Sequence, residues 1–521
     1  MPDITKSRDQ VNIGFTDLAD GTFAEQQSMV FSDRARDAVG RLKVSRQQNI
    51  YEADFEYGSQ PLRWESFTAN GASVTHLPGQ GGVRMRVPTT VGAICIRQSR
   101  PYHRYQPGKT MFMATAIQLG PAVSGNVQRT GFFDDSNGVF FEDSGATAAN
   151  PTGMGVVIRS DISGAPVDTR VELQNWNGNR TIINQIDWLR IQMLWIEYAW
   201  YGAGAVRFGC FIDGQPILFH TTGFGNRPGQ VVPWARTGNL PVRYEQRNIA
   251  TIAAQNDMFH YGVSVMVEGG VDEQRGFTYA YGMDPASPRR SVPNGSTRFP
   301  VLTVRNRTMG TLEFTQASAA ISAGTTTSMT VSGTPWAVNQ WAGRAVAFGA
   351  AGAIPTVARI TSNTANTLTI QDVVTGGALA VAPAVGNNYT IGLINRGQIL
   401  PRRLLISANA LCTVELISSN ATTPVSLTGA NFQALTTLGA GGSFAERDVS
   451  ATALTGGEVV YAFTSPSGAG SDLQQIELQD LFPLYNTIAG NRPDWITVAI
   501  TNNSGGSALV GAHIIGQEAM S

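Results

Sequence analysis

The residues with the right chemistry to cleave a polysaccharide are carboxylates in and around two stretches of alternating sequence. Glu197 lies in the apolar-rich stretch 191–200, and Asp187 precedes that stretch. Four more acidic residues surround a turn signal: Asp134, Asp135, Glu142 and Asp143. A glycosidase needs two carboxyl groups roughly 5–10 Å apart, which on one strand requires acidic residues two or four positions apart. Only Glu197 occupies the long stretch, and turn chemistry explains the other four better than catalysis does. The sequence therefore predicts that the protein is not an enzyme.

Neither a metal nor another cofactor is expected from the spacing of ligand-type residues. The string DDSNG at 134–138 looks like the start of a calcium loop, but an EF-hand needs Glu at the twelfth position, where this chain has Gly145. A calcium site completed by distant residues is the alternative. The three cysteines, Cys95, Cys210 and Cys412, are far apart, which favours buried free thiols over a zinc site or a disulfide.

Four side chains are candidates for contact with a carbohydrate or a neighbouring subunit. Trp176, in QNWNGNR, is the best candidate for an exposed tryptophan whose face stacks on a sugar ring; packing on a nearby loop is the alternative. Tyr102, His103 and Arg104 stand together in PYHRY. Tyrosine and arginine are favoured at protein interfaces, so we expect a contact there, with a structural role for His103 and ordinary solvation of Arg104 as alternatives.

Alternating residues and turn signals place these side chains on antiparallel strands. Stretches 191–200, 205–212 and 215–220 are joined by Gly-containing turns, and Asp213-Gly214 is typical of a two-residue hairpin. Asn137-Gly138 indicates a second hairpin, flanked by phenylalanines that suit cross-strand pairs. No apolar period of 3.6 residues persists over three turns, so the pattern favours an all-β, jelly-roll or lectin-like sandwich.

The chain divides into five predicted segments. These are an N-terminal arm for anchoring or assembly (1–48), a jelly-roll or lectin-like β-sandwich (49–286), a linker with the first strand of the C-terminal domain (287–309), a small β-barrel (310–394) and a C-terminal β-sandwich (395–521). The barrel segment is rich in Ala, Gly and Thr, and the flanking strings LTVRNR and NRGQILP look like two halves of one unit. We therefore expect the barrel to be inserted into a loop of the C-terminal sandwich.

The composition suits a protein that buries its surface against neighbours. Only 14% of the residues are charged, against about 25% in typical soluble proteins, and charge is depleted at interface cores. The net charge of −1 provides no basic field for nucleic acid. No apolar window reaches roughly 18 residues, so no membrane insertion is expected. The first ten residues lack an apolar core, which favours folding in a cytoplasm.

Several strings in fixed order resemble an uncharacterised family of virion structural proteins of tailed bacteriophages. They are DAVGRLKVS (37–45), RQSRPYHRYQPGKT (97–110), RTGFFDDSNGVFFE (129–142), VIRSDISGAPVDTRV (157–171), WYGAGAVRFGCFIDGQPILFH (200–220), NLPVRYE (239–245) and NRGQILP (395–401). The resemblance covers most of 37–308 and part of 395–521, and leaves out 310–394. It implies a place in a phage particle, with a lectin-like jelly roll as the main module.

The expected function follows from this resemblance. A tail fibre, spike or baseplate-associated protein would contact other virion proteins, form a homo-oligomer (a trimer is favoured) and attach to a host-surface glycan through repeated weak contacts. Such a protein would be assembled in the host cytoplasm and reside in the virion. A head fibre or capsid decoration protein is one alternative, and a polysaccharide-depolymerising tail enzyme is another.

Overall fold

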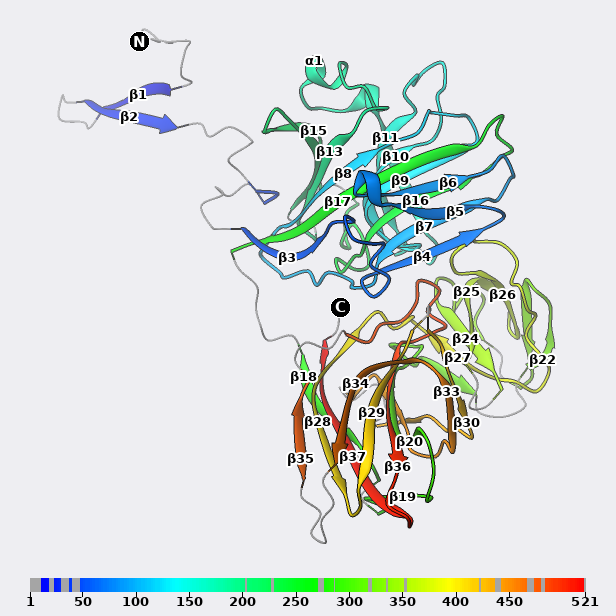
Figure 1. The fold of residues 1–521 in the computed structure, drawn as a ribbon. Helices are drawn as coiled ribbons and strands as arrows, with labels where there is room; N and C mark the ends of the chain where they lie inside the picture. The colour runs from blue at the N-terminus through cyan, green and yellow to red at the C-terminus, as the bar shows by residue number, and fades with distance from the viewer. Residues whose placement is uncertain are drawn as a thin grey trace.

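The chain folds almost entirely into β-strands. The computed structural model describes residues 11–17, 23–29, 37–39, 47–201, 204–225, 229–269, 276–284, 286–316, 321–333, 336–350, 354–420, 423–435, 442–465, 473–478 and 483–519. Strands make up 53% of the structure and helices 2%, which confirms the predicted all-β fold class. Figure 1 shows an upper sandwich, a lower sandwich and a smaller module beside them.

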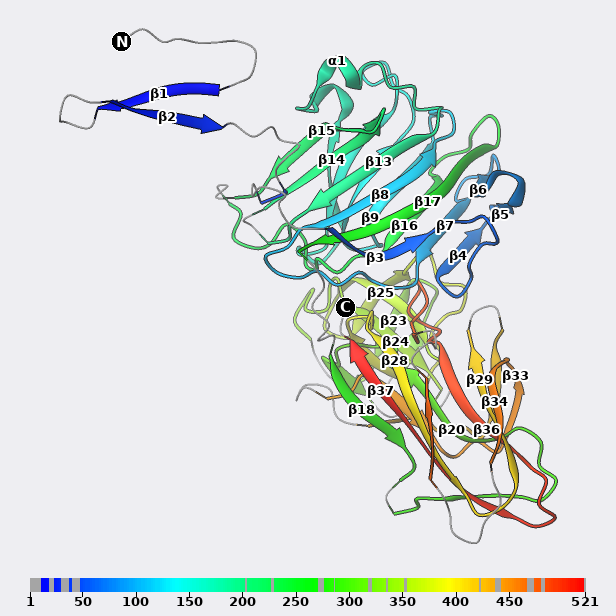
Figure 2. The same ribbon diagram turned by 60° about the vertical axis from the view of Figure 1, so that its left-hand side comes forward.

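The first module is a sandwich of two antiparallel sheets (Figures 1 and 2). The seven-stranded sheet has the order β12-β11-β10-β9-β16-β7-β4. Its strands are β4 (Trp64–Ala69), β7 (Ile94–Ser99), β9 (Asn126–Phe133), β10 (Gly138–Asp143), β11 (Met154–Ser160), β12 (Val167–Glu172) and β16 (Val242–Asn248). The second sheet has the order β15-β14-β13-β8-β17-β6-β5, and β3 also pairs with β17. Its strands are β3 (Gln47–Ala53), β5 (Ser73–Leu77), β6 (Gly82–Val87), β8 (Met111–Gln118), β13 (Gln192–Tyr198), β14 (Ala205–Ile212), β15 (Gln215–Gly223) and β17 (Asn256–Glu268).

Alternate residues of both sheets point into the core of this sandwich. On β13, Leu194, Ile196 and Tyr198 are fully buried, and they belong to one apolar cluster that draws on both sheets. This alternation is the period of two that the sequence shows. A short helix, α1 (Arg180–Ile183), lies between β12 and β13 and begins after Asn179, whose side chain accepts from the Ile182 N–H.

The predicted three-stranded meander is present as β13, β14 and β15. Asp213 and Gly214 both have positive φ, 49° and 74°, as a type I′ hairpin turn requires. The second hairpin is also present, but its turn differs from the prediction. Asp134 N–H donates to the Asn137 carbonyl, and Gly138 already pairs with Phe133 in the ladder. The connection is therefore a four-residue loop, 134–137, because the Asp134 carboxylate accepts the backbone N–H groups that follow it.

The C-terminal sandwich contains one strand that the sequence had placed in the first module. β18 (Phe277–Gly282) pairs with β37 (Ala508–Ala519), so the segment predicted to end the first sandwich at 286 belongs to the second. The predicted linker contributes β19 (Arg290–Val292), also paired with β37. The turn-rich composition around 287–296 predicted a linker without regular structure, but β19 within it forms strand pairing with β37.

Two larger sheets form this sandwich, and one of them includes β18 and β19. The first holds β18, β19, β37, β28 (Gln398–Ala408) and β35 (Gln474–Glu477). The second has the order β31-β32-β20-β36-β29-β34. Its strands are β20 (Phe299–Asn306), β29 (Cys412–Ser419), β31 (Gln433–Ala434), β32 (Ala445–Asp448), β34 (Glu458–Ser465) and β36 (Trp495–Asn502). A separate pair joins β30 (Val425–Thr428) to β33 (Ala453–Gly456).

A seven-stranded sheet lies in the chain between β20 and β28. Its order is β21-β27-β24-β25-β26-β23-β22. The strands are β21 (Phe314–Gln316), β22 (Ile321–Gly324), β23 (Ser328–Val331), β24 (Ala345–Gly349), β25 (Thr356–Asn363), β26 (Thr367–Asp372) and β27 (Asn388–Gly392). The sheet rolls around its own apolar core. No pairing joins its end strands, β21 and β22, within the described residues, so ladder bonds do not close it into a barrel. We call it the inserted module.

Part of the predicted N-terminal arm lies outside the described residues. In the rest, β1 (Val11–Asp17) pairs with β2 (Phe23–Met29) as an antiparallel hairpin. Ala38 accepts a hydrogen bond from the Ala205 N–H at the start of β14, which ties the arm to the first sandwich. Among the described helices, none has the length and apolar character needed to span a membrane.

Candidate functional site

Trp176, predicted to be exposed, is a core residue. Its exposure is 3%, its ring stacks on Phe219 with centroids 5.6 Å apart, and its indole N–H donates to the Val171 carbonyl. Trp188 packs edge-on against it. The polar string around Trp176 suggested a surface loop, but the aromatic partner on β15 lies more than 40 residues away and gives no local signal. A buried indole cannot stack on a sugar.

His103 is also buried, so it makes no contact with a sugar at the surface. Its ring packs against Tyr51 and Phe132, and its backbone N–H bonds to the Leu240 carbonyl. Burial lowers the pKa of His103 to about 3, so the ring is neutral at ordinary pH. The structure therefore supports the structural alternative for this histidine.

The two neighbours of His103 have different environments. Tyr102 is buried, and its hydroxyl donates to Asp134 over 3.2 Å, while Arg396 of the C-terminal module lies 5.2 Å from the centre of its ring. Tyr102 thus takes part in a contact within the chain. Arg104 is exposed on the first sandwich, where its predicted contact with a partner stays a prediction.

The carboxylates that the sequence offered for catalysis do not form a pair. Glu197 is 1% exposed and lies 3.1 Å from Arg207 on the neighbouring strand. Asp187 is exposed and pairs with Arg190. Each has its own cation, and the hydrogen bonds of Asp187 hold the loop before β13. Neither arrangement provides the proton donor that glycoside hydrolysis needs.

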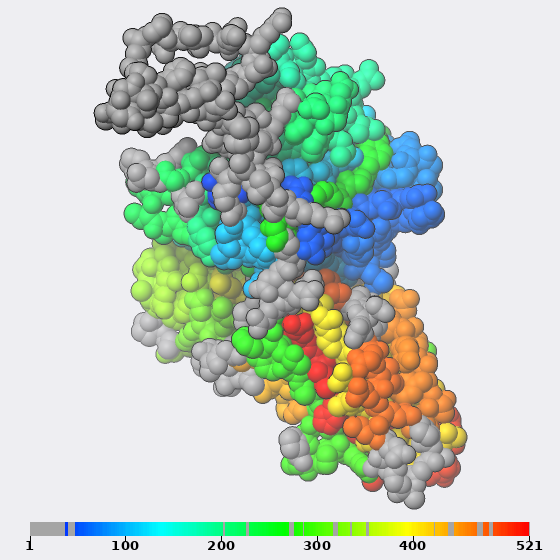
Figure 3. Space-filling view, turned by 90° about the vertical axis from the view of Figure 1, so that its left-hand side faces the viewer, coloured from blue at the N-terminus to red at the C-terminus, as the bar shows by residue number. Residues whose placement is uncertain are grey.

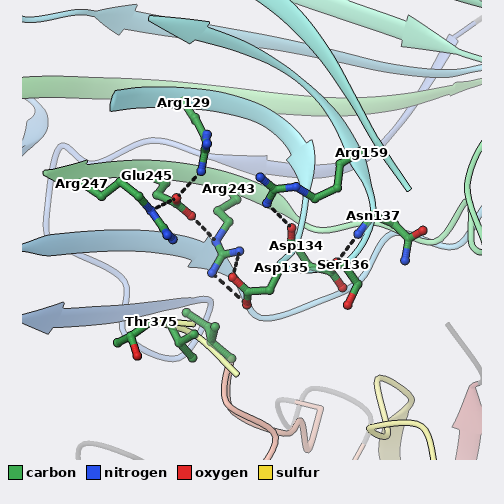
Figure 4. A network of polar contacts seen from close by, with 12 residues as sticks. Arg129, Asp134, Asp135, Ser136, Asn137, Arg159, Arg243, Glu245, Arg247 and Thr375 are labelled. Atoms are coloured by element: carbon green, nitrogen blue, oxygen red, sulfur yellow. Dashed lines mark hydrogen bonds and ion pairs between the residues drawn. The ribbon is translucent and has the colours of Figure 1, made fainter. Parts of the chain in front are cut away.

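An array of charged residues that the sequence did not predict lies on the outer face of the seven-stranded sheet (Figure 4), although two of its carboxylates, Glu142 and Asp135, were among the candidates named from the sequence. Three neighbouring strands of the sheet, β10, β9 and β16, place Glu142, Arg129 and Glu245 opposite one another. Arg129 bonds to Glu142 over 2.6 Å and to Glu245 over 2.8 Å. Arg247 lies 2.6 Å from the same oxygen of Glu245. We call this array, with Arg243, Arg159, Arg170 and their acidic partners, the charged sheet face.

The arginines of the charged sheet face also cover two aromatic rings. Phe133 and Phe140 are fully buried, with ring centroids 4.4 Å apart. Arg129 and Arg159 lie 5.5 and 5.1 Å from the Phe140 ring centre. Stacked guanidinium groups are weakly hydrated and pack well on aromatic faces. The rings are therefore covered by charged side chains instead of being open to a sugar.

The electrostatics of this face do not suit acid catalysis. Burial acts to raise the pKa of Glu245, but Arg247, Arg243 and Arg129 outweigh it and hold that pKa well below its usual range. A glycosidase needs one carboxyl group with a raised pKa at the bond to be cleaved. Asp143 has a pKa raised to about 6 by burial, but it is 3% exposed and faces the sandwich interior. The described residues also hold no cluster of three metal-ligating side chains.

Two junctions attach the first sandwich to the other modules, and Figure 3 shows all three modules packed together. The apolar junction joins Ile94 and Ile96 of β7 to Val373 and Val374 of the inserted module. It continues into Ile488 of the C-terminal module. Thr375, next to this contact, lies beside the charged sheet face in Figure 4. The inserted module thus covers one side of the sheet that carries the charges.

The ionic junction joins the first sandwich to the C-terminal module. Arg100 donates to both carboxylate oxygens of Asp494 over 2.5 and 2.7 Å, and both side chains are nearly inaccessible to water. The Tyr485 N–H donates to the same carboxylate. Glu65 of β4 accepts the Ile488 N–H over 2.9 Å. Arg100, which directly precedes PYHRY, therefore joins two modules of the same chain, and a contact of this segment with a neighbouring subunit stays a prediction.

The fold and these contacts define an all-β protein with a jelly-roll sandwich as its largest module. No family model matches the chain, and no curated protein matches it. Solved structures align with about two fifths of it. A family 16 glycosyl hydrolase protein from Mycobacterium smegmatis is 11% identical, with a TM-score of 0.28, over 42% of this chain and 100% of that one.

Two further structures show the range of proteins with this likeness. A pseudo β-1,3-glucanase of Mycobacterium tuberculosis is 12% identical over 43% of this chain and 99% of that one, with a TM-score of 0.30. Peanut lectin is 9% identical over 43% of this chain and 98% of that one, with a TM-score of 0.27.

Proposed function

We propose that this protein is a structural component of a tailed-phage virion, placed in a tail fibre, spike or baseplate, and that it holds β-modules outward for attachment to a host surface. The observation that carries the proposal is the double junction. A buried ion pair and an apolar cluster connect three modules into one body. A stiff, multi-module body suits a part that transmits or resists force between a particle and a surface.

The low charged fraction and the ordered phage-like strings are the sequence support for this proposal. A head fibre or capsid decoration protein would use the same architecture, so position in the particle needs a direct measurement. Antibodies against the purified protein should label the tails of intact particles in electron microscopy. Label confined to heads would favour the decoration role, and absence of the protein from purified particles would contradict the proposal.

We further propose that the protein acts without catalysis. The support is the pairing of carboxylates with arginines on both sheets, at Glu197 and across the charged sheet face. Incubation with host polysaccharide should release no reducing sugar. Release that is abolished by Glu197→Gln or Asp187→Asn would instead favour the depolymerase alternative.

Assembly into a homo-oligomer is the third part of the proposal, and a trimer is the favoured state. Native mass spectrometry of the full chain measures this directly. A trimer at micromolar concentration is the expected result. A chain that stays monomeric at that concentration would contradict self-assembly while leaving the virion location to the labelling experiment.

A further inference from the structure

A cavity of about 240 Å³ lies where the three modules meet. The first sandwich contributes the loop 134–137 and part of 236–239, the inserted module contributes β24 and β25, and the C-terminal module contributes residues around 395–397. Pockets at domain interfaces are preferred places for ligands. A volume below the roughly 300–1,000 Å³ of drug-sized sites fits one small polar unit.

Four arginines line this cavity from three modules: Arg236, Arg344, Arg359 and Arg396. Arg344 uses only its Nε atom, which bonds to Glu313 over 2.7 Å. Among the described residues, its two terminal nitrogens have no hydrogen-bond partner. Arg359 donates to the Asp135 carbonyl and the Ser136 hydroxyl, which are neutral acceptors. Arg359 therefore has positive charge to offer a ligand, and Arg344, although paired with Glu313, offers the N–H groups of its two terminal nitrogens.

The two carboxylates in the cavity wall are already satisfied. Asp134 accepts from two backbone N–H groups and from the Tyr102 hydroxyl. Burial acts to raise the pKa of Asp134, but Arg396 and the N–H groups hold it below its usual range. Asp135 pairs with Arg243 over 2.9 Å. The acidic residues of the wall are thus neutralised by other groups, and the cavity favours an anion.

The remaining side chains that line the cavity are both polar and apolar, which suits the hydroxyl groups and the ring face of a sugar. Thr237, Asn239 and Thr311 supply hydroxyl and amide groups, whereas Val373 and Phe444 supply apolar surface. A guanidinium fork matches the planar geometry of a carboxylate with two parallel hydrogen bonds. A ligand with one carboxylate, several hydroxyls and an apolar ring face would use every kind of surface that the cavity presents.

We infer that this cavity binds a carboxylated sugar, a hexuronic acid unit of an acidic polysaccharide, with the carboxylate held by Arg344 and Arg359. The inference deepens the attachment role and rests on it for its biological setting, but the binding can be measured on the isolated protein. Because all three modules line the cavity, the ligand also stabilises their arrangement by binding only the assembled form.

The test is isothermal titration calorimetry of the full chain with trigalacturonate, maltotriose and inorganic phosphate. We expect binding of trigalacturonate, no heat from maltotriose, and weaker binding of trigalacturonate at higher salt. Arg344→Gln should weaken the affinity at least tenfold. Arg403→Gln is the matched control, because Arg403 also pairs with a glutamate through Nε over 2.8 Å but lies outside the cavity.

Three results would overturn the inference. They are equal affinity of Arg344→Gln and Arg403→Gln, binding of phosphate in preference to trigalacturonate, and absence of binding by the folded wild-type chain. Arg359→Gln is a second variant, and its thermal unfolding shows whether the junction has stayed intact. None of these results bears on the labelling of particles, so failure of the cavity inference and failure of the virion proposal are distinguishable.

Discussion

The apolar junction and the ionic junction attach the same sandwich to the other modules by opposite means. Ile94 and Ile96 meet valines of the inserted module in a contact that has no preferred direction. Arg100 and Asp494 meet through one guanidinium nitrogen that donates to both carboxylate oxygens, which is a directional contact. The comparison suggests that burial of apolar surface supplies adhesion, whereas the buried charges select which relative orientation of the modules is allowed.

The largest expected effect comes from breaking the ionic junction on one side. Asp494→Ala leaves the Arg100 guanidinium buried without its partner, which should cost about 3–5 kcal/mol of the free energy of unfolding. Urea denaturation followed by tryptophan fluorescence measures this loss. The exposed pair Arg403–Glu477 is the control, and Glu477→Ala should change stability by less than about 0.5 kcal/mol. Equal losses of unfolding free energy for Asp494→Ala and Glu477→Ala would show that the ionic junction stabilises the protein no more than an exposed ion pair does.

Truncation of an isoleucine side chain in the apolar junction should have the next largest effect. Ile96 is fully buried, and Ile96→Ala removes methyl groups without leaving a charge, so we expect a loss of about 2–4 kcal/mol. The variant should keep the orientation of the modules, because Arg100 and Asp494 are intact. Small-angle scattering that shows a changed shape for Ile96→Ala, and an unchanged shape for Asp494→Ala, would reverse the roles we assign to the two junctions.

Removal of one hydroxyl near both junctions should have a smaller effect. Tyr102→Phe deletes the hydrogen bond to Asp134 but keeps the ring under Arg396. We expect a loss of about 1 kcal/mol, typical of one hydrogen bond, in thermal unfolding. A loss as large as that of Asp494→Ala would mean that Asp134 depends on Tyr102 much more than its two backbone donors suggest.

The smallest expected effect is a pH dependence carried by Glu65. Withdrawal from water raises its pKa from 4.5 to about 7, so between these values the folded chain holds a proton that the unfolded chain has released. The contribution of Glu65 to stability should therefore fall as pH rises from about 4.5 to 7, whereas buried His103, whose pKa is lowered, contributes in the opposite direction. Glu65 is partly exposed, so screening by water limits its effect to less than about 1 kcal/mol. Glu65→Gln keeps an acceptor for the Ile488 N–H, and the stability of the wild type relative to this variant should fall over the same pH range.

The sequence predicted what is local in this fold and missed what is distant. The meander at 191–220 follows from alternation and from the Asp213-Gly214 turn, both of which act between neighbours in the chain. Burial of Trp176 depends on Phe219, and the Arg100 interface depends on Asp494, 394 positions away. Contacts of that separation leave no pattern in a single sequence. The charged sheet face was missed in part for the same reason, because Arg129 and Glu142 belong to the predicted hairpin but Glu245 on β16 lies 116 positions from Arg129.

The inserted module enters and leaves its host through one narrow point. Gly310 N–H bonds to the Leu393 carbonyl, and Asn395 N–H bonds to the Thr308 carbonyl, so the two ends of the insertion lie side by side. Anything folded between these positions can be exchanged without shifting the register of β20 or β28. A different module joined at these two ends would therefore need one matching feature, an apolar surface that covers Ile94 and Ile96 of β7.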